Sequence, residues 1–309
     1  MIPVTQVMGI LNVTPDSFSD GGAYLDGERA LAHAREMMAA GAGIIDVGGE
    51  STRPGAARVS PEEELARVVP VVSALVAEGA TVSVDTMRAS VARAALQAGA
   101  RMINDVSGGL ADPDMIPSVA DSDADYVVMH WRDHSSRMQS LATYDDVVEE
   151  VLAELLAQRD RAVGGGVDPS RIILDPGLGF SKTAEHNWQL LRHLDRFQAL
   201  GHRLLVGASR KAFLGHLLGG REPHGRDGAT AALSFWSALH GVWGVRTHDV
   251  AGQSDAITVA MQLLGDGVAR VDVAGPIDPT PAGERATRPH RGSADPLRGD
   301  SDRSLPPRA

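Results

Sequence analysis

The chain of 309 residues has no cysteine, little aromatic content, and only two lysines, Lys182 and Lys211, among its 29 basic residues. The absence of cysteine excludes disulfide bonds, thiolate metal sites and cysteine nucleophiles. No run approaches the about 18 consecutive apolar residues of a membrane span. The first residues also lack the basic and apolar regions of a secretory signal. We therefore expect a cytoplasmic protein that binds no membrane.

The formal net charge is −11, so the chain has no overall basic field that would attract nucleic acid. We expect no nucleic-acid partner, and any bound anion must be held by a local group of cations. Apolar residues make up 43% of the chain, which is enough for a large core.

Residues 274–309 differ in composition from the rest of the chain. They hold 7 of the 17 prolines, and their only apolar residues larger than alanine are Ile277, Leu297 and Leu305. Such a segment cannot bury enough surface to offset the entropy lost on ordering. We expect one folded domain over residues 1–273 and a disordered tail over 274–309.

The first 273 residues alternate short apolar runs with longer amphipathic stretches. The predicted strands are Val7–Val13, Ile44–Gly49, Thr81–Thr86, Met102–Ser107, Tyr126–His130, Ile172–Gly177, Arg203–Ser209 and Val242–Asp249. The predicted helices include Glu28–Ala40, Glu62–Glu78, Ala89–Ala98, Asp145–Val163, Ala184–Leu200 and Ser254–Leu264. Pro70 should kink the second helix or end its first half.

Eight strand–helix units predict an α/β fold, a single-domain (β/α)8 TIM barrel. The alternative is an open doubly wound sheet, but no Gly-x-Gly-x-x-Gly follows the first strand.

Every predicted strand ends in polar residues, which in a barrel converge on one mouth. They are Asn12, Glu50, Asp85, Asn104 with Asp105, His130, Asp175, Ser209 to Lys211, and Arg246 with His248. A single polar strand end is often a helix cap or a hydrogen-bonded core residue. Eight such ends favour an enzyme or a small-molecule binder.

Seven segments in order resemble the motifs of dihydropteroate synthases. They are Met8–Gly22, Gly48–Gly55, Val84–Thr86, Ile103–Gly109, Asp175–Phe180, Gly207–Phe213 and Arg246–Asp249. The resemblance implies a pterin-binding barrel that joins a dihydropterin methyl diphosphate to 4-aminobenzoate in folate synthesis. It also implies a homodimer and a target of sulfonamides, which mimic aminobenzoate.

The resemblance assigns the pterin ring to Asp85, Asn104, Asp175 and Lys211, with Asp85 and Lys211 as the catalytic residues. A flat ring rich in donors and acceptors needs carboxylates and amides on rigid strands, which agrees with this assignment. Two of these residues have structural alternatives, because Asp175 could form a turn and Asn104 could cap a helix. Lys182, in a Gly-Phe-Ser-Lys loop, is expected at the surface.

The remaining substrate groups have their own residues by the same resemblance. The diphosphate is assigned to Thr52, Arg246, Thr247 and His248, and a Mg²⁺ cofactor to Asn12. The aminobenzoate is assigned to Thr52, Pro54, Phe180, Ser209 and Lys211. The chain departs from many relatives at Ala212, where they carry a serine that helps to hold the benzoate carboxylate.

The expected reaction is an S_N1-like substitution in which diphosphate departs before the aminobenzoate amine attacks. Magnesium and the cations would stabilise the departing diphosphate, and Asp85 would face the carbocation. One alternative is a methyltetrahydrofolate-type pterin methyltransferase, which handles no diphosphate and would not need Asn12 or the Arg246 and His248 pair. The other is a non-catalytic paralogue that binds pterin.

Overall fold

The computed structural model describes residues 2–14, 22–50, 59–134, 137–265 and 268–269. The chain divides into two units, Met1–Val273 and Ala274–Ala309. The disorder expected for residues 274–309 and the roles expected for Thr52 and Pro54 lie outside the described residues. They stay predictions.

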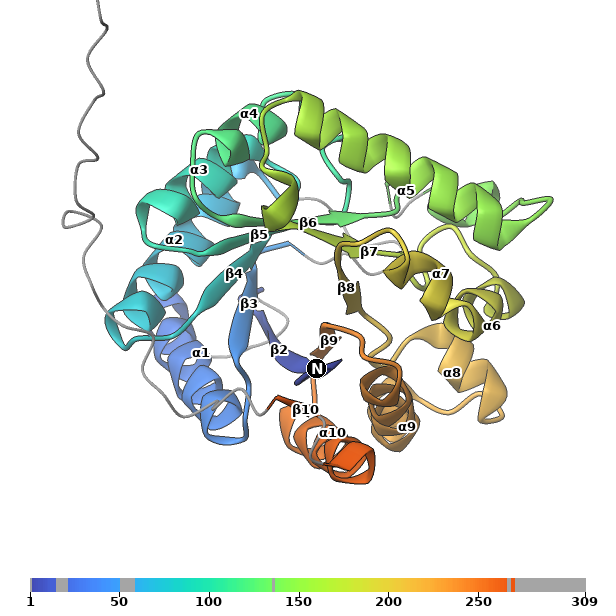
Figure 1. Cartoon of the computed structure of the whole chain (residues 1–309). Helices are drawn as coiled ribbons and strands as arrows, with labels where there is room; N and C mark the ends of the chain where they lie inside the picture. The colour runs from blue at the N-terminus through green and yellow to red at the C-terminus, as the bar shows by residue number, and fades with distance from the viewer. Residues whose placement is uncertain (1, 15–21, 51–58, 135–136, 266–267, 270–309) are drawn as a thin grey trace, which may run out of the picture. The chain divides into compact units, whose positions relative to one another are not determined.

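Eight parallel strands close into a barrel in which each strand pairs with the next and the last pairs with the first (Figure 1). These strands are β2 (Gln6–Asn12), β3 (Ile44–Gly48), β4 (Val82–Asp85), β5 (Met102–Asp105), β6 (Asp125–Met129), β7 (Ile172–Asp175), β8 (Arg203–Val206) and β9 (Gly244–Thr247). Two further short strands, β1 (Ile2–Pro3) and β10 (Val268–Ala269), pair with each other outside the barrel. The predicted TIM barrel is confirmed, because each apolar run became one strand.

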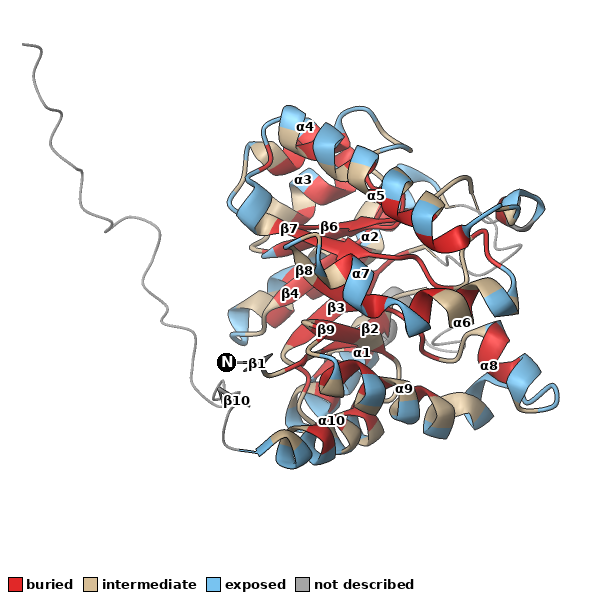
Figure 2. Cartoon of the chain, turned by 45° about the vertical axis from the view of Figure 1, so that its right-hand side comes forward, coloured by how far each residue is buried: buried red, intermediate tan, exposed pale blue. Residues whose placement is uncertain are grey.

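Helices surround the barrel and turn their exposed faces outward (Figure 2). They are α1 (Gly22–Ala39), α2 (Pro61–Ala77), α3 (Ala89–Gln97), α4 (Met115–Ala120), α5 (Val147–Gly164), α6 (Ala184–Arg192), α7 (Leu194–Gln198), α8 (Ala212–Leu217), α9 (Asp227–Leu239) and α10 (Val250–Leu264). Short 3-10 turns lie at Met138–Leu141, Pro169–Arg171 and Pro223–Arg226. In the described part of the chain, no helix is long and apolar enough to cross a membrane.

One helix prediction needs correction, and one of the two alternatives given for Pro70 is excluded. The predicted helix over 184–200 is divided at His193, whose ψ of 32° interrupts the helical path between α6 and α7. Helix α2 does not end at Pro70 but runs through it. Pro70 is on the exposed face, while Val68, Val71 and Val72 pack into the core, so packing stabilises the helix across the proline.

The inside of the barrel has its own apolar cluster, which forms a floor beneath the C-terminal ends of the strands. Its buried members are Met8, Ile44, Met102, Val127, Ile173 and Leu205. Side chains of a strand alternate between its two faces, so residues two positions after a floor residue also point inward. This alternation decides which polar strand ends reach the mouth.

Candidate active site

Three polar residues rise directly above this floor. Asp46, Asn104 and Asp175 each lie two positions after a floor residue of the same strand. Asp85 pairs in register with Asn104 on one side and with Gly48 on the other. We use the name mouth cluster for the set Asp46, Asp85, Asn104, Asp175, Lys211 and Arg246.

Arg246 connects two acids of the mouth cluster. Its Nε donates to Asp46 Oδ2 at 2.6 Å, and its Nη2 donates to Asp85 Oδ2 at 2.7 Å. The same Asp46 oxygen accepts a hydrogen bond from Asn104 Nδ2 at 2.9 Å. Side chains from four strands are therefore fixed relative to one another before any ligand binds. The Asn104 amide bonds to Asp46 in the mouth, in contrast to the alternative in which it caps a helix.

Asp46 is a member of the site that the sequence analysis missed. Its carboxylate is fully buried, and its Oδ1 has no hydrogen-bond partner among the described residues. An unpaired buried polar atom of this kind is costly, about 1–3 kcal/mol. The available signal was an acid in the middle of the apolar run Ile44–Gly49. It was missed because only residues at strand ends were considered as candidates for the site.

Burial raises the pKa of Asp85 to about 7. Arg246 opposes this rise in the pKa by favouring the carboxylate, while the neighbouring charge of Asp46 adds to it. A carboxyl group with a pKa near 7 changes its charge close to physiological pH. Perturbed groups of this kind in a cleft are candidates for functional residues.

Lys211 is the N-cap residue of α8, in the connection that follows β8, and its side chain reaches the segment after β7. Its Nζ donates to the carbonyl of Leu178 and lies 4.4 Å from the centre of the Phe180 ring. Burial lowers the pKa of Lys211 to about 8, and the charge of Asp175 acts in the opposite direction. The structure thus places Lys211 close to Phe180 and Asp175, and the sequence predicted all three for the pterin ring or the aminobenzoate.

Asp175 performs the turn role suggested by the sequence and still belongs to the mouth. Its Oδ1 accepts a hydrogen bond from the backbone N–H of Gly177 at 2.7 Å. A Cβ atom built on Gly207 would lie 3.6 Å from its Oδ2, so glycine at this position leaves room beside the carboxylate. Burial raises the pKa of Asp175, and the nearby charge of Lys211 limits the rise.

A second polar group connects the ends of β8 and β9. Ser209 Oγ lies 2.9 Å from His248 Nδ1 and accepts a hydrogen bond from the His248 backbone N–H at 3.1 Å. Thr247 is almost fully buried, and its hydroxyl lies 3.4 Å from Ser209 Oγ. Three residues predicted for diphosphate or aminobenzoate are therefore neighbours. Arg246 instead bonds to the acids of the mouth cluster.

Asn12 ends β2 and is paired in register with Gly48. A Cβ atom built on Gly48 would lie 3.8 Å from Asn12 Oδ1 and 3.6 Å from the Cβ of Asp85. The amide oxygen of Asn12 and the carboxylate of Asp85 therefore both lie next to Gly48. The described residues hold no cluster of three or more His, Asp or Glu side chains that could bind a metal by themselves.

Glu50, Asp105 and His130 bond to residues away from the mouth, so the expected convergence of all eight strand ends is only partly correct. Asp105 follows the inward residue Asn104 and accepts hydrogen bonds from Ser107, Gly109 and Tyr126. Glu50 bonds to Arg88 at 2.7 Å. His130 bonds to Glu154 of α5 at 2.9 Å. Alternation along the strands explains Asp105 and His130, each of which follows an inward residue.

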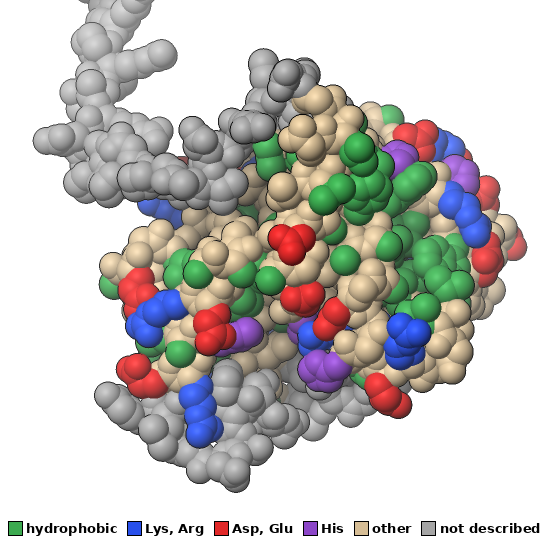
Figure 3. All heavy atoms as spheres, turned by 90° about the horizontal axis from the view of Figure 1, so that it is seen from below, with side chains coloured by type: hydrophobic (Ala, Val, Ile, Leu, Met, Phe, Trp, Pro, Cys, Tyr) green, Lys and Arg blue, Asp and Glu red, His purple; other side chains and the backbone are tan. Residues whose placement is uncertain are grey.

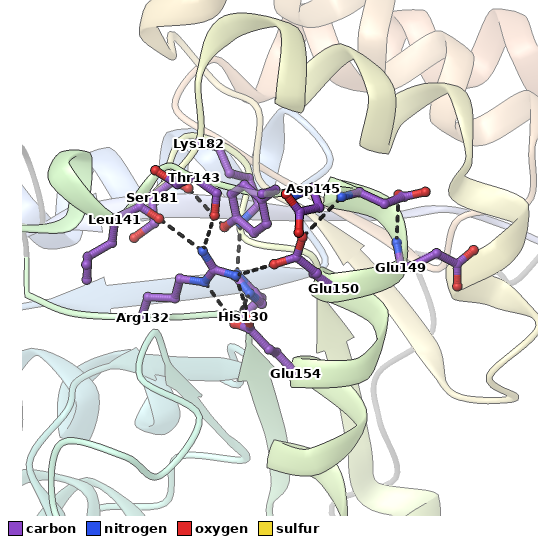
Figure 4. Close-up of polar contacts among 12 residues, drawn as sticks. His130, Arg132, Leu141, Thr143, Asp145, Glu149, Glu150, Glu154, Ser181 and Lys182 are labelled. Atoms are coloured by element: carbon purple, nitrogen blue, oxygen red, sulfur yellow. Dashed lines mark hydrogen bonds and ion pairs between the residues drawn. The ribbon is translucent and has the colours of Figure 1, made fainter.

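Lys182 is not at the surface, so that prediction is wrong. Only 4% of it is exposed, and its Nζ lies 2.9 Å from His130 Nδ1. It belongs to a buried group between β6, α5 and the segment after β7, shown in Figure 4. We use the name outer cluster for His130, Arg132, Tyr144, Glu154 and Lys182.

Comparisons with known proteins agree with this geometry. A family model described as pterin binding enzyme matches residues 8–248. The chain is 58% identical over 268 residues to the dihydropteroate synthase of Mycobacterium leprae, which covers 85% of this chain and 94% of that protein.

Solved structures give the same result. The Yersinia pestis dihydropteroate synthase with a sulfonamide drug complex has a TM-score of 0.79 and 41% identity, covering 84% of this chain and 94% of that one. The Xanthomonas albilineans dihydropteroate synthase with 4-aminobenzoic acid has a TM-score of 0.79 and 44% identity, covering 84% and 93%. These findings favour the synthase over the methyltransferase and the non-catalytic paralogue. The chain belongs to the dihydropteroate synthases, the pterin-binding enzymes that form dihydropteroate in folate biosynthesis.

Proposed function

We propose that the mouth cluster binds the dihydropterin ring and promotes loss of diphosphate from its methylene carbon. The observation that carries this proposal is the group of Asp46, Asp85, Asn104 and Arg246, whose side chains are hydrogen-bonded to one another above the barrel floor. Preorganised carboxylates and amides suit the edge of a pterin ring, which carries both donors and acceptors. Asp175 and Lys211 complete the ring site from β7 and the end of β8.

In the reaction, the bond between the methylene carbon and the diphosphate oxygen breaks, and diphosphate takes the electron pair. The amine of 4-aminobenzoate then forms the new C–N bond and gives up one proton. Asp85 is the negative group placed to stabilise the cation between these steps. Its ionised form is required, and Arg246, at 2.7 Å, favours that form.

The diphosphate is assigned to Arg246, Thr247, His248 and Thr52. His248 and Thr247 meet around Ser209, next to the mouth cluster, which supports an anion site there. Asn12 has the donor that Mg²⁺ prefers, a single amide oxygen on a rigid strand, and diphosphate oxygens and water would complete the shell. Mg²⁺ would offset negative charge on the leaving diphosphate.

The aminobenzoate is assigned to Phe180, Ser209, Lys211, Thr52 and Pro54. Phe180 and Lys211 support this assignment most directly, because the ring and the ammonium lie 4.4 Å apart. An aromatic face and a cation suit a benzoate, which has a flat ring and a carboxylate. Ala212 supplies no hydroxyl, so the carboxylate is bound by Lys211, Ser209 and backbone N–H groups.

The experiment that tests the proposal is turnover of 7,8-dihydropterin methyl diphosphate with 4-aminobenzoate, followed by diphosphate release. We expect turnover with Mg²⁺ and loss of turnover with a chelator, restored when Mg²⁺ is added in excess. A sulfonamide should compete with aminobenzoate. Turnover that is unchanged by the chelator would contradict the role assigned to Asn12 and Mg²⁺.

We propose a cytoplasmic homodimer that forms through α9 and α10. Val259 and Leu263 lie four residues apart on α10 and are 54% and 68% exposed, and Trp236 of α9 is 42% exposed. Figure 3 views the molecule from the side on which α10 lies in Figure 1, and shows hydrophobic side chains gathered there. Light scattering should give a dimer for the wild type and a monomer for Leu263→Glu.

A further inference from the structure

The segment after β7 presents two groups to Lys211, the Phe180 ring and the Leu178 carbonyl. Its backbone turns through positive φ angles, 67° at Gly177, 81° at Gly179 and 49° at Ser181. Glycine adopts such angles readily, but a left-handed serine is uncommon and costs of order 1 kcal/mol. Contacts from outside the segment offset this cost.

Lys182 supplies two of those contacts. Its Nζ donates to the carbonyls of Gly177 and Phe180, each at 3.1 Å. Another contact joins it to His130 Nδ1 at 2.9 Å (Figure 4). An ammonium has three donors, and here each has an acceptor. The two carbonyls belong to both ends of the turn that carries Leu178 and Gly179.

His130 fixes the direction of its hydrogen bond with Lys182. Glu154, whose pKa is about 2, is a carboxylate and only accepts, so His130 Nε2 carries the proton donated to it at 2.9 Å, and His130 Nδ1 accepts from Lys182. Burial lowers the pKa of His130 to about 4, so the ring is neutral at pH 7. The backbone N–H of His130 also bonds to the Asp175 carbonyl at 2.9 Å. The end of β6 therefore supports the segment through both main chain and side chain.

Tyr144 also holds the segment, because its hydroxyl donates to the Ser181 carbonyl at 2.9 Å. Tyr144 is itself held beneath Arg132, whose guanidinium carbon lies 3.9 Å from the ring centre. Glycine is required at position 177, because a Cβ atom there would lie 2.4 Å from the His130 carbonyl oxygen. The segment is thus held by hydrogen bonds to the outer cluster, while the Phe180 ring and the Leu178 carbonyl contact Lys211.

We infer that Lys182, assisted by Tyr144, is a positioning residue for 4-aminobenzoate. It fixes the Gly177–Ser181 backbone so that Phe180 and the Leu178 carbonyl hold Lys211 in place. This inference rests on the proposed aminobenzoate site. Lys182 touches no substrate, and its effect reaches the reaction through Phe180 and Lys211.

The test compares Lys182→Met and Tyr144→Phe with Phe180→Ala in steady-state kinetics. Lys182→Met keeps most of the side-chain length but removes the donors, and we expect the KM for aminobenzoate to rise about tenfold. The KM for the pterin diphosphate should change less than threefold. Tyr144→Phe removes one hydroxyl and should raise the aminobenzoate KM by about two- to fivefold.

Tyr126→Phe is the matched control. It also removes a buried tyrosine hydroxyl, which bonds to Asp105 at 2.8 Å rather than to the segment after β7. We expect it to lower the melting temperature and to leave both KM values unchanged. If loss of stability alone raised the aminobenzoate KM in Tyr144→Phe, then Tyr126→Phe would raise it as well.

The outcomes separate the inference from the site on which it rests. If Phe180→Ala raises the aminobenzoate KM while Lys182→Met and Tyr144→Phe do not, the positioning role is wrong and the site stands. If Phe180→Ala also has no effect, the proposed aminobenzoate site is wrong. Should Lys182→Met fail to fold, Tyr144→Phe decides, and a wild-type aminobenzoate KM for that variant overturns the inference.

Discussion

The mouth cluster and the outer cluster are both built from buried and half-buried charged groups near the C-terminal ends of the strands, but their hydrogen bonds are completed to different extents. In the outer cluster, Lys182 has three acceptors and both ring nitrogens of His130 are bonded. In the mouth cluster, Asp46 Oδ1 has no partner among the described residues. An atom without a partner can accept a further hydrogen bond, whereas a fully bonded group holds its neighbours in place.

The carboxyl groups of the two clusters also differ in pKa, although burial lowers the pKa of Lys182 as it lowers that of Lys211. Burial moves the pKa of Asp85 to about 7 and that of Lys211 to about 8, so each is close to changing its charge at neutral pH. Burial alone would raise the pKa of Glu154 in the outer cluster, but hydrogen bonds from His130 and Arg132 lower it to about 2. Asp85 and Lys211 can therefore change protonation state near neutral pH, whereas Glu154 stays ionised.

The largest expected effect comes from Asp85→Asn, which keeps the size of the side chain and removes its charge. We expect kcat to fall by about 10²–10³, the usual loss when one preorganised electrostatic group is removed. The amide oxygen can still accept from Arg246, so the melting temperature should stay close to that of the wild type. An unchanged kcat with a large loss of stability would make Asp85 a structural residue.

A smaller effect is expected for His248→Ala at the diphosphate. Loss of one hydrogen bond to an anion should raise the KM for the pterin diphosphate about tenfold. Binding of the same pterin without its diphosphate, measured by calorimetry, should be unchanged because the mouth cluster is intact. Equal weakening of both ligands would show that His248 does not belong to a separate anion site.

The smallest effect on activity is expected for Glu154→Gln in the outer cluster. Glu154 accepts from His130 and Arg132, so the variant should lose about 1–2 kcal/mol of stability and keep kcat within about twofold. The pKa of Glu154 is lower in the folded protein than its ordinary value of 4.5, so its charge stabilises the fold above pH 4.5. The stability difference from the wild type should shrink as pH falls from 4.5 toward about 2. A fall in kcat like that of Asp85→Asn would contradict the comparison.

Much of this arrangement could be predicted from the sequence because each barrel strand is a short apolar run that ends in polar residues. The barrel and the positions of Asp85, Asn104 and Asp175 follow from that pattern. Lys182 could not be placed, since its burial depends on His130 and two carbonyls from other parts of the chain. Asp46 stands out as an acid within the apolar run Ile44–Gly49, but its partners on β5 and β9 cannot be read from that run.

The absence of some helices from the predictions is explained by their own sequences. Helix α4 has only six residues, too few to show a helical period. The sequence of α9 is apolar on most sides, as in Ala231, Leu233 and Trp236, so it lacks an amphipathic stripe. Helix periodicity is informative only where one face meets water.

The central claim is that Asp85 must be ionised to promote loss of diphosphate, and the dependence of kcat/KM on pH tests it most directly. Because burial raises the pKa of Asp85 to about 7, the wild-type value should fall as pH drops below about 7. Above about pH 8 it should fall again as Lys211 loses its proton. In Asp85→Asn the fall on the acid side should disappear while the fall on the alkaline side remains. An acid-side fall in Asp85→Asn that matches the wild type would contradict the account.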